Sequence, residues 1–258
     1  MTTAAPVDRS DLEHQVKDMY RLVALEPNGE FHFEMGRVLA ERLGYARADL
    51  DRIPGEAIDS FAGVGYHFGL GVLENGERVL DLGSGAGMDS FIAALKVGPG
   101  GRVVGVDMTD EQRAKAERLR DRAGFANVTY LKGYIESIPC PDASFDVVIS
   151  NGVANLSAEK ERVFAEVARV LKPGGRLAIS DIVTEAPLPQ GVAENATLWA
   201  ACIGGAMQQD GYRETIVAAG FRVLRVVDNT AYRFISSNAK AASEKWGVKS
   251  ISLVAEKR

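Results

Sequence analysis

Residues 79–87 read VLDLGSGAG, and this stretch decides the fold because an apolar run ends in an acid followed by three alternating glycines. The next residues, 88–96, carry apolar side chains at helical spacing. Glycines between a strand and a helix can adopt backbone angles closed to other residues, and they let a ligand approach the helix N-terminus. The stretch therefore predicts a strand, a ligand-binding turn and a helix. A turn that only links the two elements is the alternative.

The glycine spacing and the acid distinguish between cofactors. A dinucleotide fingerprint counted from Gly83 needs a glycine at position 88, where this chain has Met88. Asp81 would repel a pyrophosphate but would favour a cofactor with a cationic amino acid end. The turn therefore favours S-adenosylmethionine over NAD. The residues expected to hold this cofactor are Asp81, Gly83, Ser84, Gly85 and Gly87.

A second acid follows the next predicted strand. Residues 102–106 form an apolar run that leads into Asp107, which lies 26 positions after Asp81. A carboxylate at the end of a second strand can accept both hydroxyls of a ribose, and Met108 is then placed to flank the adenine. Asp107 can instead cap the helix that is expected to begin near Asp110. We expect the ribose contact, because the glycine turn precedes it.

Strand and helix patterns alternate along the rest of the chain. Strands are expected within 128–139, 144–151 and 176–183, and a helix over 158–171. Such alternation predicts a doubly wound α/β fold, a mainly parallel sheet with helices on both faces. Ligands in these sheets bind beyond the carboxyl ends of the strands. The polar residues expected at that edge are Asp81, Asp107, Glu136 and Asn151.

The motifs DLGSGAG, GVD, SFDVV and LKPGG together resemble the class I S-adenosylmethionine-dependent methyltransferases over residues 75–183. The resemblance implies a seven-stranded Rossmann-like sheet, completed by a last strand over 250–255. It implies backbone contact from the glycine turn with the methionine end and places Asp107 on the ribose. It also implies Ile135 and Glu136 near the adenine, although an exposed loop acid such as Glu136 needs no function. Asn151 matches a position that helps hold the amino end of the cofactor and faces the substrate.

The stretches GVDMT, KGYIE, VVISN followed by NLS, and LWAACIGGA look like the arsenite methyltransferase branch of that family. That branch holds trivalent arsenic with cysteine thiolates, as expected for a soft centre. This chain has Gly152 and Val64 where the branch has cysteines, whereas Cys202 matches and Cys140 has no counterpart. The resemblance therefore implies a methyltransferase for another small molecule, or an arsenite methyltransferase that uses fewer protein thiols.

Two regions outside the sheet are expected to enclose the substrate. Residues 1–74 lack the strand pattern and have helical stretches over 12–25 and 35–43, so we expect a helical N-terminal cover. The S-adenosylmethionine-binding domain is then 75–258, with a lid insertion at about 184–210. Each candidate below also has a structural interpretation, as a packing or hydrogen-bonding residue. The candidate substrate-pocket residues are Tyr20, Tyr66, His67, Asn155, Trp199 and Cys202.

Composition limits the classes of partner. The 258 residues carry a net charge of −5 and no dense basic stripe, so we expect no nucleic-acid partner. The sequence has no run of 18 apolar residues, and its N-terminal residues include acids where a signal peptide would have basic and then apolar residues. We therefore expect a cytoplasmic protein without a membrane partner. The chain has two cysteines outside any Cys-x-x-Cys pair and three scattered histidines. We therefore expect neither disulfides nor a metal site. The sequence predicts no particular oligomeric state.

The function expected from these observations is methyl transfer from S-adenosylmethionine to a small-molecule acceptor. The protein is expected to orient the reactants and exclude water, and no residue is singled out as a catalytic base. Two alternatives stay open: an arsenite methyltransferase with fewer thiols, and a module that binds the cofactor without turnover.

Overall fold

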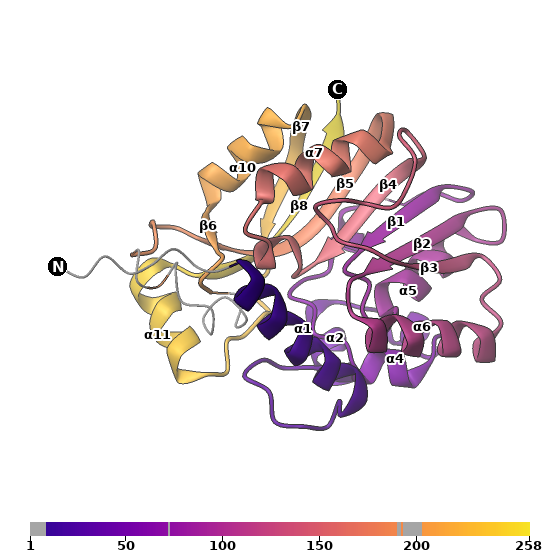
Figure 1. Cartoon of the computed structure of the whole chain (residues 1–258), viewed down its shortest axis with the longest axis horizontal. Helices are drawn as coiled ribbons and strands as arrows, with labels where there is room; N and C mark the ends of the chain where they lie inside the picture. The colour runs from indigo at the N-terminus through magenta and orange to yellow at the C-terminus, as the bar shows by residue number, and fades with distance from the viewer. Residues whose placement is uncertain (1–8, 72, 190–191, 193–202) are drawn as a thin grey trace.

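The computed structural model describes residues 9–71, 73–189, 192 and 203–258. Its centre is a sheet of eight strands, of which seven follow the order β3-β2-β1-β4-β5-β8-β7 (Figure 1). Neighbouring strands from β3 to β5 run parallel, and β8 is antiparallel to both β5 and β7. The predicted doubly wound, mostly parallel α/β sheet is confirmed. The strands are β1 (Arg78–Leu82), β2 (Arg102–Asp107), β3 (Val128–Lys132), β4 (Phe145–Asn151), β5 (Leu171–Thr184), β6 (Met207–Gln208), β7 (Phe221–Asp228) and β8 (Lys249–Lys257).

Both faces of the sheet are buried along its central strands, as their near-continuous apolar sequences require, whereas the edge strand β7 is partly exposed. Val79 of β1 packs in one apolar cluster with α5 and α6, whereas its neighbour Leu80 packs in another with α7 and α10. The sheet is therefore the middle layer of three. The helices that cover it are α5 (Met88–Val97), α6 (Asp110–Ala123), α7 (Lys160–Val170) and α10 (Gln209–Ala218).

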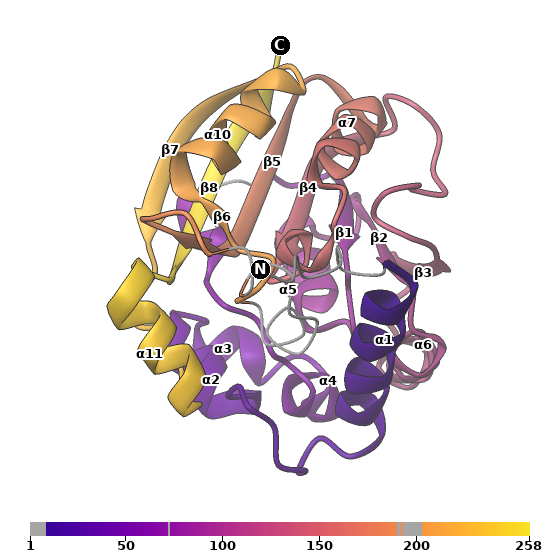
Figure 2. The same cartoon turned by 60° about the vertical axis from the view of Figure 1, so that its left-hand side comes forward.

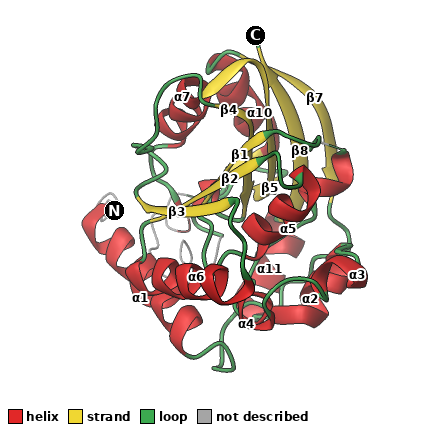
Figure 3. Cartoon of the chain, turned by 90° about the vertical axis from the view of Figure 1, so that its right-hand side faces the viewer, coloured by secondary structure: helices red, strands yellow, loops and turns green. Residues whose placement is uncertain are grey.

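The N-terminal part of the described chain is helical, as expected. Its helices gather beyond the strand ends (Figure 2), and α1 lies beside α6 (Figure 3). Lys115 of α6 fixes the end of α1, because its Nζ donates to the carbonyl of Ala24 at 2.9 Å. The division of the chain into a cover over 1–74 and a cofactor-binding domain over 75–258 stays a prediction. The N-terminal helices are α1 (Arg9–Leu25), α2 (Gly36–Leu43), α3 (Arg47–Leu50), α4 (Gly55–Asp59) and the 3-10 helix η1 (His67–Leu70).

After residue 170, three elements differ from the expectation. Strand β5 begins at Leu171, not at 176, because Leu171 pairs with Phe145 before the intervening residues bulge out and pairing resumes at Arg176. The end of the expected lid insertion forms β6, which pairs with the end of β5. Helix α11 (Ser237–Trp246) was not expected; it begins at Ser236, whose side chain accepts a hydrogen bond from Ala239 N. Among the described helices, none is long and apolar enough to cross a bilayer.

Candidate functional site

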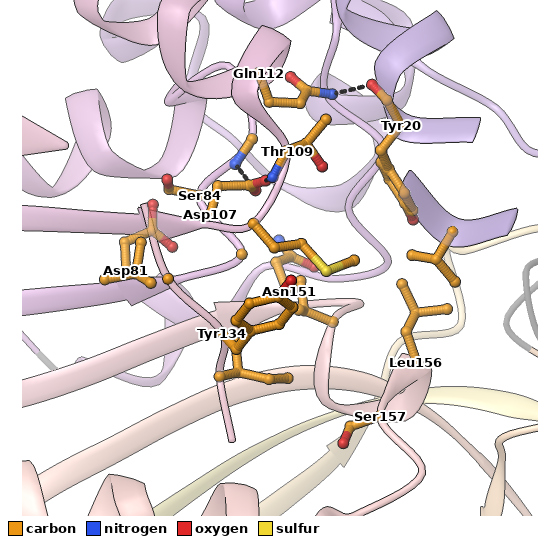
Figure 4. A pocket seen from close by; sticks show the side chains of 18 of the residues that line it. Tyr20, Asp81, Ser84, Asp107, Thr109, Gln112, Tyr134, Asn151, Leu156 and Ser157 are labelled. Carbon is orange, nitrogen blue, oxygen red and sulfur yellow. Dashed lines mark hydrogen bonds between the residues drawn. The ribbon is translucent and has the colours of Figure 1, made fainter. Parts of the chain in front are cut away.

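A cavity of about 440 Å³ lies beyond the carboxyl ends of β1, β2 and β4. Its walls come from the glycine turn after β1, the loop after β3, the 3-10 helix η2 (Ala154–Leu156) and α1 (Figure 4). This is the edge of the sheet where the sequence predicted the cofactor. Of the predicted cofactor residues, those that line the cavity are Asp81, Gly83, Ser84, Gly85, Asp107, Met108, Ile135, Glu136 and Asn151.

The glycine turn has the backbone that its sequence predicted. Gly83, Gly85 and Gly87 all have positive φ, at 65°, 53° and 91°. A Cβ on Gly83 would lie 2.4 Å from Cγ2 of Val153, so the turn also needs the missing side chain. Gly87 does not line the cavity; a Cβ there would lie 2.1 Å from Oη of Tyr130, so this glycine allows the turn to pack on β3.

Asp107 organises the cavity wall at the end of β2. Its Oδ2 accepts from Gly85 N at 2.9 Å, and its Oδ1 accepts from Thr109 N at 2.8 Å, immediately before α6. The carboxylate thus supports both the glycine turn and the start of α6, and burial raises its pKa. Ser84 Oγ and Gln112 Oε1 lie in the same wall, buried and without a hydrogen-bond partner in the described structure. Such orphaned polar atoms fit a hydroxyl-bearing ligand such as the ribose of S-adenosylmethionine.

Two further buried acids lie near the glycine turn. Asp81, at β1, accepts from Ser90 Oγ at 2.6 Å, and Asp89 lies in the first turn of α5. Burial raises the pKa of both carboxyls, that of Asp89 to about 6, and the negative charge of Asp89 raises the pKa of Asp81 further. Sequence reasoning missed Asp89, because an acid in the first turn of a helix is explained by the helix dipole alone.

Asn151 is the centre of a hydrogen-bond network at the end of β4. Its Oδ1 accepts from the backbone N–H groups of Val64 and Gly65, at 2.8 and 3.2 Å. Its Nδ2 donates to Asp89 Oδ2 at 3.0 Å, and also lies within hydrogen-bond distance of Gly65 O and Tyr45 Oη. The side chain therefore fastens the segment around Val64 to the sheet.

Helix α1 and the loop after β3 close the opposite side of the cavity. Lys17 Nζ donates to Tyr134 Oη at 2.7 Å, and this hydroxyl donates to Glu13 Oε1 at 2.9 Å. Glu136 accepts a hydrogen bond from Ser157 Oγ, which joins the loop to the residues after η2. Glu136 is thus a wall residue with a partner rather than an isolated loop acid.

Of the predicted substrate-pocket residues, the described structure places only Tyr20 in the cavity wall, where its carbonyl accepts from Gln112 Nε2 at 2.9 Å. Tyr66 packs on Tyr45. His67 is fully buried, neither ring nitrogen has a partner among the described residues, and burial lowers its pKa to about 3. Asn155 is buried, and its backbone N donates to Asp181 at 2.9 Å. Trp199 and Cys202 lie outside the described residues.

The part of the cavity wall that the structure describes contains no cluster of cysteine thiols or metal-binding side chains. Cys140 is half-buried and packs with the α7 side of the core. Val64 and Gly152, where the resemblance to the arsenite branch implies cysteines, supply no sulfur. Residues 9–71, 73–189, 192 and 203–258 contain no group of three His, Cys, Asp or Glu side chains placed to hold a metal ion.

Comparison with known proteins agrees with this geometry. The family described as "Methyltransferase domain" matches residues 73–220. An arsenite methyltransferase of Halobacterium salinarum is 43% identical over 187 residues, covering 72% of this chain and 48% of that protein. One of Aquipseudomonas alcaligenes is 41% identical over 192 residues, covering 70% and 55%.

The chain spans about half the length of these curated relatives. Among solved structures, an arsenic(III) S-adenosylmethionine methyltransferase from Chlamydomonas reinhardtii is similar with a TM-score of 0.67 and 33% identity, covering 81% of this chain and 72% of that one. The family match covers the strand, the glycine turn and the acids that build the cavity. The chain therefore belongs to the S-adenosylmethionine-dependent methyltransferase family.

Proposed function

We propose that this chain transfers the methyl group of S-adenosylmethionine to a small-molecule acceptor in the cavity beyond β1, β2 and β4. The observation that carries the proposal is the placement of Asp107 and the glycine turn, with two orphaned polar oxygens, in the wall of a cavity of about 440 Å³. Such a volume is in the range of small-molecule sites. When bound, S-adenosylmethionine supplies an activated methyl group.

The residues of the cavity contribute binding, orientation and exclusion of water. Asp107, Ser84 and Gln112 offer oxygens to the ribose hydroxyls, and Met108 and Ile135 offer apolar contact to the adenine. Leu156 and Tyr20 wall the side away from the glycine turn and keep water from the reacting atoms. The described lining contains no histidine or lysine, and the groups in it that could accept a proton are carboxylates. An acceptor that is already nucleophilic needs only placement by the protein.

Arsenite is a second candidate acceptor, because both relatives compared above are arsenite methyltransferases. The described cavity wall offers no thiolate, so arsenic would have to arrive bound to an external thiol or be held by Cys202. The alternative of a cofactor-binding module without turnover predicts the same cavity and differs only in product formation.

The test is mass spectrometry of products after the purified protein is incubated with S-adenosylmethionine, a thiol reductant and arsenite, with a parallel arsenite-free sample. Methylated arsenic would favour the arsenite methyltransferase. Cofactor binding without methylated arsenic would favour another small acceptor, to be sought by screening for S-adenosylhomocysteine release. An absence of both binding and release would contradict the proposal.

The same proposal covers cell location and partners. The two cysteines are typical of a protein in a reducing compartment, which we take to be the cytoplasm. The net charge of −5 favours small molecules over nucleic acid as partners.

A further inference from the structure

Asp89 lies in the cavity wall, and neither the sequence motifs nor the family match gives it a role. It stands in the first turn of α5, is only 6% exposed, and lines the cavity together with Asp81 and Asn151. In the described structure neither Asp81 nor Asp89 forms an ion pair with a lysine or an arginine. Two buried carboxylates without a counter-cation are costly, and a positively charged group between them would remove much of that cost.

The orientation of Asp89 is fixed from two elements. Tyr45 Oη, from the N-terminal cover, donates to Asp89 Oδ1 at 2.5 Å, and Asn151 Nδ2, from the end of β4, donates to Oδ2 at 3.0 Å. Each carboxylate oxygen has two lone pairs, so each retains a site for a further donor. Tyr45 is itself buried, and its ring packs edge-on against the rings of Phe61 and Tyr66.

The side-chain amide of Asn151 has no free site for a further hydrogen bond. Its Oδ1 already accepts two backbone N–H groups, and its Nδ2 has three acceptors for two hydrogens. The resemblance to methyltransferases places Asn151 at the amino end of the cofactor, but in this chain the side chain is committed to holding the segment around Val64 and orienting Asp89. The side chains at this end of the cavity that keep a free acceptor site are the carboxylates of Asp81 and Asp89.

We propose that Asp89, oriented by Tyr45 and Asn151, receives the ammonium group of the cofactor's amino acid end, together with Asp81. This inference rests on the proposed function. Tyr45 acts through Asp89 and is a positioning residue. The N-terminal cover therefore takes part in cofactor binding through a hydrogen bond to a carboxylate that itself touches the ligand.

Two ligands that differ in the amino acid end test the assignment. S-Adenosylhomocysteine carries the ammonium group, whereas 5′-methylthioadenosine has the same adenosine and thioether without it. We expect Asp89→Asn to weaken S-adenosylhomocysteine binding by roughly 10- to 100-fold, the range for a hydrogen bond to a charged group, and to change methylthioadenosine binding less than about twofold. Isothermal titration calorimetry measures both. Asp107→Asn is the matched control, because loss of the ribose acceptor should weaken both ligands alike.

Tyr45→Phe provides a second variant that keeps the ring and removes only the hydroxyl. We expect a selective loss of S-adenosylhomocysteine affinity of roughly three- to tenfold, and no additional loss when the substitution is combined with Asp89→Asn. Methylthioadenosine affinity in each variant reports whether the cavity is intact.

If Asp89→Asn loses affinity for both ligands equally, or loses affinity for neither, the assignment is overturned. If Asp89→Asn does not fold, a Tyr45→Phe variant without a selective loss overturns it instead. Failure of the wild-type chain to bind either ligand would count against the proposed function itself and is distinguished in this way from failure of the Asp89 assignment.

Discussion

A Cβ built on Gly152 lies 3.3 Å from Cγ1 of Val64. The segment after β4 and the N-terminal cover therefore meet at the two positions where the resemblance to the arsenite methyltransferase branch implies cysteines. Ile203, the chain neighbour of Cys202, packs in the same apolar cluster as Val64. This corner of the described structure is apolar, and two side chains introduced there would be close enough to share one ligand.

The first prediction follows from this proximity. The double variant Val64→Cys/Gly152→Cys should bind one equivalent of a trivalent arsenical such as phenylarsine oxide, because two adjacent thiolates form a chelate for a soft centre. With Cys202→Ala present in all three proteins, each single variant should bind far more weakly. Gly152 has a φ of 75°, so a cysteine there should also cost about 1–2 kcal/mol of stability. Mass spectrometry of the intact protein counts the bound arsenic, and equal binding by the single and double variants would contradict the proximity.

The second prediction concerns Asp107. Replacement by alanine removes the acceptor of the Gly85 and Thr109 N–H groups and the expected acceptor of the ribose hydroxyls. Affinity for S-adenosylhomocysteine should fall at least tenfold, since hydrogen bonds to a charged group are worth about 1.5–3 kcal/mol. Calorimetry gives the dissociation constant. An unchanged constant would remove the ribose assignment and leave Asp107 as a helix-start residue.

The glycine turn offers a third prediction with an internal control. Gly83→Ala places a methyl group 2.4 Å from Cγ2 of Val153 at a φ of 65°, so both steric overlap and backbone strain oppose folding. We expect the free energy of unfolding to fall by about 2–4 kcal/mol, with loss of cofactor binding. Gly76→Ala, at a φ of 86° with no atom within 4 Å of the new methyl group, should lose only about 1–2 kcal/mol and keep binding. Urea denaturation measures the free energy of unfolding of both variants. Equal losses of free energy in Gly83→Ala and Gly76→Ala would show that overlap with Val153 does not matter.

The order of strands and helices was predictable because it depends on local pattern. The apolar run at β1, the acid and the glycines form one continuous signal, and each part lies where the sequence placed it. Asp107 was likewise identified by its place after β2, although its second partner, Gly85 N, depends on the folded turn.

What the sequence did not predict depends on contacts between distant segments. Tyr45, Asp89 and Asn151 are separated by 44 and 62 positions, and no periodicity links them. The aromatic and glycine residues around Tyr66 and His67 in the sequence favour a pocket. In the structure the 3-10 helix η1 packs against β5 and β8 and buries the histidine. Side-chain direction in an irregular segment is set by packing, which local pattern does not encode.

The burial of His67 yields the last prediction. In the fold its pKa is lowered to about 3 because the ring is desolvated, whereas an unfolded histidine titrates near 6.5. The unfolded chain therefore binds a proton below pH 6.5 that the folded chain does not, so stability present above pH 6.5 is lost as the pH falls towards 3. From pH 7 to pH 5 the loss from this residue should be about 2 kcal/mol.

His67→Leu should escape that loss, because leucine fills a similar volume and does not titrate. The free energy of unfolding of the variant, measured by urea denaturation, should exceed that of the wild type by about 2 kcal/mol more at pH 5 than at pH 7. Phe68→Leu, at the adjacent buried position, is the control and should shift the free energy by the same amount at both pH values, since it titrates in neither state. A parallel pH dependence in His67→Leu and the wild type would show that the imidazole is accessible to protons in the fold, contrary to its burial.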